Sequence, residues 1–210
     1  MKCPLCEIRK AKRFCPAKGG QICAVCCGTK REVEIDCPSD CVYLHVGREY
    51  ESEKLARSGE MPPRTERLWE QEFINRHYGI FLSLWGVMLD ARALFPEMVD
   101  SDVQVTLDSL IRTYETMDKG IYYESTPASA VQKNLYRALK AFFESSNQEF
   151  DISSGRLKTS TILDCLRFQR ELALAIALPR PRSRAFLDHL QDIHARSLPE
   201  VREEPRIILP

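Results

Sequence analysis

The sequence lacks any long hydrophobic run. Its longest apolar stretches are residues 80–89, which Ser83 and Gly86 interrupt, and residues 172–178. Both are well short of the roughly 20 residues that a membrane-spanning helix needs. The first six residues, MKCPLC, do not form the apolar core of a secretory signal peptide. We therefore expect a cytoplasmic protein that does not bind membranes.

A net charge is also missing, because 30 basic residues balance 30 acidic ones. This balance excludes attraction of the whole chain to nucleic acid or to a membrane surface. The chain has no P-loop, dinucleotide-binding fingerprint, nucleophile elbow or His-Glu-x2-His motif. Neither His77 nor His189 follows an acidic residue by three positions, as a di-metal helical bundle requires. We therefore expect no catalytic activity.

Cysteine, in contrast, is concentrated at the N-terminus, where eight of the nine cysteines lie within the first 41 residues. In a reducing cytosol, clustered cysteines are metal ligands more often than disulfide partners. The eight predicted metal ligands are Cys3, Cys6, Cys15, Cys23, Cys26, Cys27, Cys37 and Cys41.

The spacing of these cysteines divides them into two sets of four. Two Cys-x2-Cys pairs, residues 3–6 and 23–26, are separated by 16 residues, which is typical of a four-cysteine zinc site. The remaining four would complete a second site. Neighbouring side chains in extended backbone point to opposite sides, so Cys26 and Cys27 can each face one ion. We predict two zinc ions, with the assignment of Cys26 and Cys27 and a role for His45 left open.

The order and spacing of these residues resemble the interleaved two-zinc fingers of the MYND and HIT classes. Those fingers begin with a Cys-x2-Cys pair, carry a Cys-Pro step such as Cys15-Pro16, and have a later stretch like residues 22–27. This chain departs from the pattern by closing with Cys37-x3-Cys41 in place of a histidine-cysteine pair. The resemblance implies that the finger binds proteins or scaffolds an assembly, and we expect a protein partner.

Zinc bound by four thiolates has no open position for water, so a structural role is expected for both ions. Binding of such an ion can contribute about 10–16 kcal/mol of apparent free energy to folding, which a short segment poor in aliphatic residues would need. An iron–sulfur protein with a redox role is the alternative, because iron clusters are also held by four thiolates.

Basic residues accompany the cysteines, with eight lysines and arginines against one acid, Glu7, in residues 1–31. They could offset the negative charge of the thiolates. They could also form a phosphate-binding surface, which makes nucleic-acid binding an alternative function. That alternative would use Arg9, Lys10, Lys12, Arg13, Lys18, Lys30 and Arg31.

Beyond Pro62-Pro63 the apolar residues recur at steps of three and four, which predicts helices and no strands. The expected helices lie within residues 65–95, 100–119, 126–143, 158–178 and 183–193. Thr126-Pro127 is expected to cap the third of them. The predicted fold is a small zinc-stabilised cysteine-rich domain followed by an all-α bundle of about five helices. The predicted boundaries are 1–47 for the two-zinc finger domain, 48–63 for a linker or short helix, 64–198 for the helical bundle and 199–210 for a tail.

Overall fold

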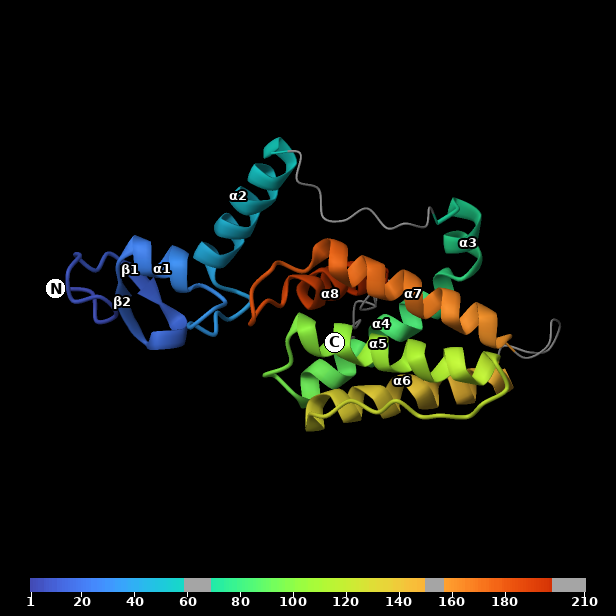
Figure 1. Cartoon of the computed structure of the whole chain (residues 1–210). Coiled ribbons are helices and arrows are strands. Elements are labelled where there is room, and N and C mark those ends of the chain that lie inside the picture. Colours follow the sequence, from blue (N-terminus) through green and yellow to red (C-terminus); the bar gives the residue numbers. More distant parts are fainter. Residues whose placement is uncertain (59–68, 150–156, 198–210) are drawn as a thin grey trace, which may run out of the picture.

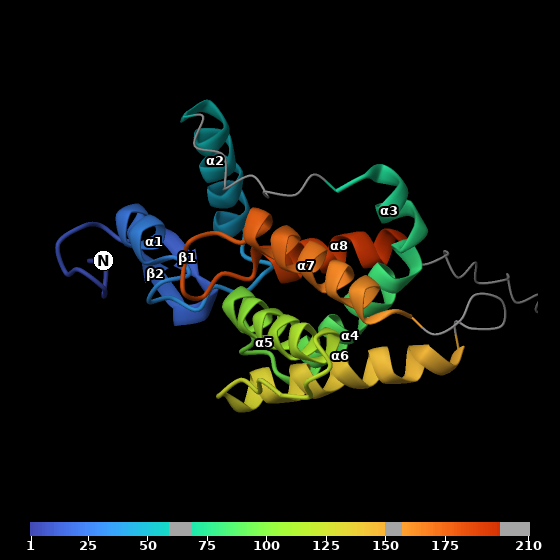
Figure 2. The same cartoon turned by 45° about the vertical axis from the view of Figure 1, so that its right-hand side comes forward.

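The computed structural model describes residues 1–58, 69–149 and 157–197, and these residues are mostly helical. Figures 1 and 2 show a small cysteine-rich unit, the head, at one end of the molecule and a helical bundle, the body, at the other. The head contains β1 (Arg13–Cys15), β2 (Gly20–Ile22) and α1 (Ala24–Lys30). Helix α2 (Val42–Ser58) lies at the junction between head and body.

Strands β1 and β2 form an antiparallel hairpin in which Arg13 is opposite Ile22 and Cys15 is opposite Gly20. A short 3-10 turn, Pro16–Lys18, joins the strands and ends at Gly19, whose φ of 60° lies in the left-handed region. Glycine adopts that conformation without the steric cost that a Cβ atom would impose. The tight turn therefore brings the chain back alongside β1 and leads directly to Cys23.

The body consists of α3 (Gln71–Arg76), α4 (Tyr78–Leu94), α5 (Asp100–Asp118), α6 (Ala130–Glu149), α7 (Thr159–Ile176) and α8 (Ala185–Ser197). Helix α5 is central and packs against α6, α7 and α8, while α4 covers α6 and α8. Burial of each large apolar side chain contributes about 1.5–3 kcal/mol. Fully enclosed members of this core include Leu84, Met88, Leu107, Leu110, Leu139, Phe143, Leu166, Phe186 and Leu190.

The apolar periodicity predicted these helices closely, with two differences. The first expected helix divides at His77, where φ is −105° and ψ is 11°, into α3 and α4. Thr126 does not cap α6. Instead the Ser129 hydroxyl accepts a hydrogen bond from Gln132 N at 3.2 Å, and Ser129 N donates to Gln132 Oε1 at 3.4 Å. This reciprocal pair is a capping box, and it starts the helix at Ala130.

The short helix expected within residues 48–63 is longer than predicted. It begins at Val42, and α2 therefore runs without a break across the expected boundary between residues 47 and 48. The rest of the predicted linker, residues 59–63, and the predicted tail, residues 199–210, lie outside the described residues. The proposed division of the chain into domains stays a prediction.

Within the described parts of the chain, no helix is both long enough and apolar enough to cross a membrane.

A buried carboxylate ties two distant helices together. Asp100, at the start of α5, is 2% exposed, and its carboxylate accepts hydrogen bonds from Ser183 Oγ at 2.7 Å and from Phe186 N and Leu187 N at 3.2 Å. Asp100 therefore satisfies the free backbone N–H groups at the beginning of α8. Burial raises the pKa of Asp100 to about 6, although these hydrogen bonds oppose the increase.

This carboxylate should make stability depend on pH. The pKa of Asp100 is 3.8 ordinarily and about 6 in the fold, so folding takes up a proton between these values. The stabilisation is fully present below pH 3.8 and is lost as pH rises through about 6. Relative to Asp100→Asn, which cannot ionise, the native protein should lose up to about 3 kcal/mol between pH 4 and pH 7. Urea unfolding at several pH values measures this, and a pH-independent difference would contradict it.

Candidate metal centre

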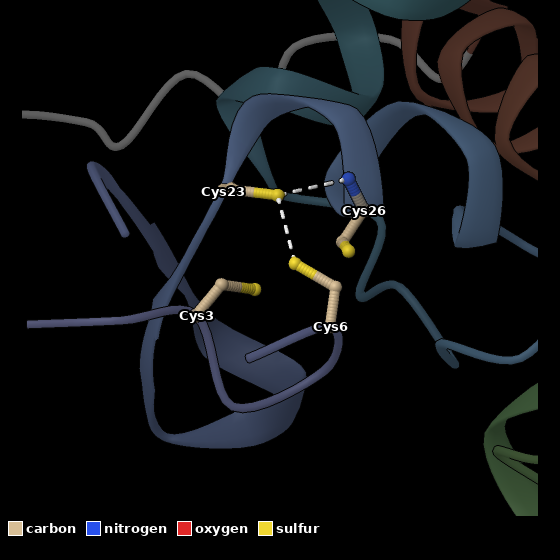
Figure 3. A group of neighbouring side chains, drawn as sticks. All are labelled: Cys3, Cys6, Cys23 and Cys26. Atoms are coloured by element: carbon tan, nitrogen blue, oxygen red, sulfur yellow. Dashed lines mark hydrogen bonds between the residues drawn. The ribbon is translucent and has the colours of Figure 1, made fainter. Parts of the chain in front are cut away.

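Four of the eight predicted cysteine ligands come together in the head. Cys3 and Cys6 lie in the turn that opens the chain, where Glu7 N donates to Cys3 O at 2.7 Å and Glu7 has a φ of 55°. Cys23 caps α1, and Cys26 lies in its first turn. Figure 3 shows the four side chains converging from these two segments on a common centre.

The sulfur positions fit a single tetrahedral ion. All four Sγ atoms lie within 4.8 Å of one another, and Cys6 Sγ is 3.9 Å from Cys23 Sγ. A tetrahedral zinc with bonds of about 2.3 Å would place its sulfur ligands about 3.8 Å apart. Only small shifts of the side chains would therefore be needed for these four cysteines to bind a metal ion.

The site is enclosed. Cys3, Cys23 and Cys26 are between 0% and 4% exposed, and Cys6 is partly exposed. The buried side chains packed with them include Ala11, Ile22 and Ile35. A tetrahedral ion held here would have all four positions filled by protein sulfur, with no position for substrate or water.

Backbone N–H groups surround the sulfurs and favour their charged form. Hydrogen bonds from the backbone of Arg9 and Ile8 lower the pKa of Cys6 to about 6. Cys26 N donates to Cys23 Sγ at 3.4 Å. Burial, followed by hydrogen bonds with the neighbouring thiols, raises the pKa of Cys26 to about 12. The pocket thus favours the thiolate form at some positions and disfavours four thiolates together. A bound cation would offset the repulsion among four such charges.

The second predicted set of ligands is not gathered in the same way. Among the described residues, the only group of three or more potential ligand atoms at metal-binding distance is the first set. Cys15 is buried in β1, while Cys27, Cys37 and Cys41 are partly exposed. His45 is exposed on α2 and belongs to no such group.

Cys37 nevertheless packs against the buried cluster of the head that contains Cys15, another member of its set. Burial raises the pKa of Cys37, and the negative charges of Cys41, Glu32 and Cys15 raise it further, against a hydrogen bond from the Glu32 backbone. Cys165, the ninth cysteine, is 1% exposed in the body, where burial raises its pKa to about 12. It is an ordinary core thiol.

An ion-pair network connects the loop that carries Cys37 to the body. Glu32 is 1% exposed and has a φ of 52°. Arg48 Nη2 on α2 donates to Glu32 Oε1 at 2.5 Å, and Arg48 Nη1 donates to Asp188 Oδ2 on α8 at 2.6 Å. Burial acts to raise the pKa of Asp188, but hydrogen bonds from Arg48, Ser39 and Arg92 outweigh it and keep that pKa below its ordinary value. We call Glu32, Arg48 and Asp188 the junction triad.

The segment between α7 and α8 makes further contacts with the same loop. Arg182 N donates to Glu32 O at 2.9 Å, and Arg180 Nη1 donates to Arg31 O at 2.6 Å. Arg184 Nη1 pairs with Asp36 Oδ1 at 2.5 Å. Sequence reasoning missed this network, because the partners are isolated charges far apart in the chain that follow no periodic pattern.

A cleft of about 610 Å³ opens beside the junction, lined by residues that include Cys37, Ser39, Arg92 and Arg184. Its arginines are already paired, since Arg92 Nη2 contacts Asp188 Oδ1 at 2.6 Å and Arg184 contacts Asp36. A carboxylate thus offsets the charge of each arginine, although Arg92 Nη1 is buried and has no hydrogen-bond partner in the described part of the chain.

The seven residues of the alternative nucleic-acid surface do not all face solvent. Lys30 pairs with Glu34, and Arg31 is 7% exposed beside Glu51. Arg13 lies over the ring of Tyr43, with Cζ 4.8 Å from the ring centroid. The four residues that remain exposed are Arg9, Lys10, Lys12 and Lys18.

Comparisons with protein-family models, with curated proteins and with solved structures find no match to this chain. The resemblance of the head to MYND and HIT fingers stays a prediction.

Replacing a helical glycine by alanine usually stabilises a protein, but the contact between Gly47 of α2 and Arg31 predicts the opposite. A Cβ atom on Gly47 would lie 1.2 Å from Arg31 Nη1, and Arg31 is too enclosed to move freely. Gly47→Ala should therefore destabilise the protein by about 1–3 kcal/mol, the usual cost of overpacking. Gly79→Ala in α4 meets no atom within 4 Å and should stabilise it by about 0.5–1 kcal/mol. Denaturant unfolding measures both changes, and a stabilising Gly47→Ala would disprove this packing.

Proposed function

We propose that the chain is a zinc protein in which Cys3, Cys6, Cys23 and Cys26 hold one structural ion, and that it acts by binding a partner and not by catalysis. The observation that carries this proposal is the convergence of four sulfurs within 4.8 Å in an enclosed pocket. A site with four thiolate ligands shapes the protein around it and leaves no position at which a substrate could be activated.

The same geometry favours a single ion over an iron–sulfur cluster. A cluster interposes several iron and sulfide atoms between its cysteine ligands, so the ligands must stand further apart than they do here. A tetrahedral set of four thiolates is otherwise characteristic of zinc or iron. Metal analysis separates zinc from a single iron bound in the same way.

We further propose a second zinc ion held by Cys15, Cys27, Cys37 and Cys41. Two observations support it. Cys27 and Cys37 pack against the buried cluster that contains Cys15, and the charges of Cys41, Glu32 and Cys15 act to raise the pKa of Cys37 after the effect of burial. The Oε2 atom of Glu32, beside the same cysteine, is buried and accepts no hydrogen bond in the described part of the chain. A divalent cation at this position would offset the accumulated negative charge.

A binding role follows from the resemblance to MYND and HIT fingers, which bind proteins or scaffold assemblies. In this proposal the ions keep the head in shape, the junction triad fixes the head on the body, and the exposed surface of the head meets the partner. A macromolecular partner suits the exposed apolar side chains of the head, because Ile8 and Phe14 are more than half exposed while Cys3, Cys23 and Cys26 are buried.

Metal content tests the proposal directly. Protein purified without added metal should contain two zinc ions per chain by elemental mass spectrometry and should be colourless. Cys23→Ser should lower the zinc content to about one by removing the first site. Cys37→Ser should also lower it to about one, by removing the second site. Cys165→Ser, which alters the core thiol, is the matched control and should retain both ions.

The outcomes distinguish the two sites. Iron with visible absorbance, or no bound metal at all, would refute the zinc proposal. A Cys37→Ser variant that keeps two zinc ions would refute only the second site. Because ligands bind as thiolates, zinc should also be released as pH falls, and a chelator titration at pH 5 and pH 7 measures this.

A further inference from the structure

We propose that the outward face of the head hairpin binds single-stranded nucleic acid. This face, which we call the basic strip, is formed by Lys2, Lys10, Lys12, Phe14 and Lys18. The inference rests on the proposed function, because the metal-bound sulfurs on the inner side would hold the strip in shape, and it names the class of partner.

Burial alternates along the chain from Lys10 to Cys15. Lys10 and Lys12 are exposed and Phe14 is 58% exposed, whereas Ala11 and Cys15 are 5% and 7% exposed. Alternation with a period of two places every second side chain on the same side of extended backbone. The two lysines and the phenylalanine therefore share the side that faces away from the sulfurs.

Neighbouring segments widen this face. Lys2 is the bridge partner of Lys10, with Cys3 N donating to Arg9 O at 2.8 Å beside it. Residues that are directly opposite in a ladder present their side chains to the same side. Lys18 is exposed in the turn that joins β1 to β2, next to the strand that carries Phe14. The strip thus combines four exposed lysines with one exposed aromatic side chain.

The lysines of the strip are available to a ligand. In the regions that the structure describes, none of Lys2, Lys10, Lys12 and Lys18 forms an ion pair with a carboxylate. These lysines are poorly placed to offset the charge of thiolates, because Cys3 and Cys15 are buried on the opposite side of the backbone. Three other basic residues of the head do have partners: Lys30 pairs with Glu34, Arg31 lies beside Glu51, and Arg13 lies over the ring of Tyr43.

The combination of charge and ring selects the partner. Lysines interact with phosphates irrespective of sequence. An exposed aromatic ring adds a surface on which an unpaired base can stack, and every base has such a face. A duplex hides its base faces, and an acidic peptide segment has no array of bases. Single-stranded nucleic acid is therefore the partner that uses both features of the strip.

Fluorescence anisotropy of the full zinc-loaded chain with labelled 15-nucleotide oligo-dT and oligo-U tests the inference. Each phosphate contact on a single strand changes the slope of log K against log salt by about −0.7, so four lysines should give a slope of about −3. A duplex of the same length should bind more weakly at each salt concentration.

Two variants separate charge from stacking. Lys10→Gln combined with Lys12→Gln should make the salt slope shallower by about 1.4. Phe14→Ala should weaken binding about 5- to 150-fold and leave the slope unchanged. The matched control combines Lys119→Gln with Lys133→Gln, which remove the same charge from exposed positions on the body, and should bind like the native chain.

Zinc content is measured on every sample, so that a failure of the strip proposal can be distinguished from a failure of the metal proposal. A zinc-loaded chain that shows no salt-sensitive binding refutes the strip and leaves the metal site standing. The strip proposal is also refuted if the body control loses as much binding as the Lys10→Gln and Lys12→Gln double variant, or if Phe14→Ala binds with unchanged affinity. Tighter binding to poly-glutamate or to phosphatidylserine vesicles than to either oligonucleotide would refute it in favour of a general anionic surface. If the chain holds no zinc, the Phe14→Ala comparison on that preparation still decides for or against the strip.

Discussion

One guanidinium group, that of Arg48, bridges the two parts of this protein, and the contacts of Arg180, Arg182 and Arg184 join the same two parts. It donates to Glu32 in the head and to Asp188 in the body at 2.5 and 2.6 Å, and all three side chains are largely enclosed. Removal of one member of a buried ion pair commonly costs about 3–5 kcal/mol, because the partner keeps its charge without compensation. The loop that carries Cys37, helix α2 and helix α8 are therefore positioned together.

The two sides of the head carry different kinds of side chain. Its inner side holds the buried sulfurs of Cys3, Cys15, Cys23 and Cys26, and its outer side carries exposed lysines together with Phe14. Both follow from a short extended segment whose side chains alternate, so the same backbone presents Cys15 inwards and Lys12 outwards. In the proposed function, a cation on the inner side keeps this segment rigid enough to display the outer side.

Much of this arrangement could be predicted from the sequence, because it depends on local spacing. The apolar residues of α5 and α7 repeat every three or four positions, and the two Cys-x2-Cys pairs have the separation of a four-cysteine site. The junction triad could not be predicted, since Glu32, Arg48 and Asp188 have no pattern in common and meet only through tertiary packing. The same holds for Arg31, which reads as a surface cation in the sequence and is buried beside Gly47 in the fold.

The continuity of α2 also limits how the molecule can be dissected. The helix begins one residue after Cys41 and carries Arg48 in its second turn, so a fragment ending near residue 47 would include the cysteines but not the guanidinium that neutralises Glu32. Such a fragment would leave the Glu32 carboxylate, which is 1% exposed in the full chain, without its arginine partner. We therefore expect that a fragment designed to contain the cysteine motif would have to include α2 at least as far as Arg48 in order to keep this ion pair.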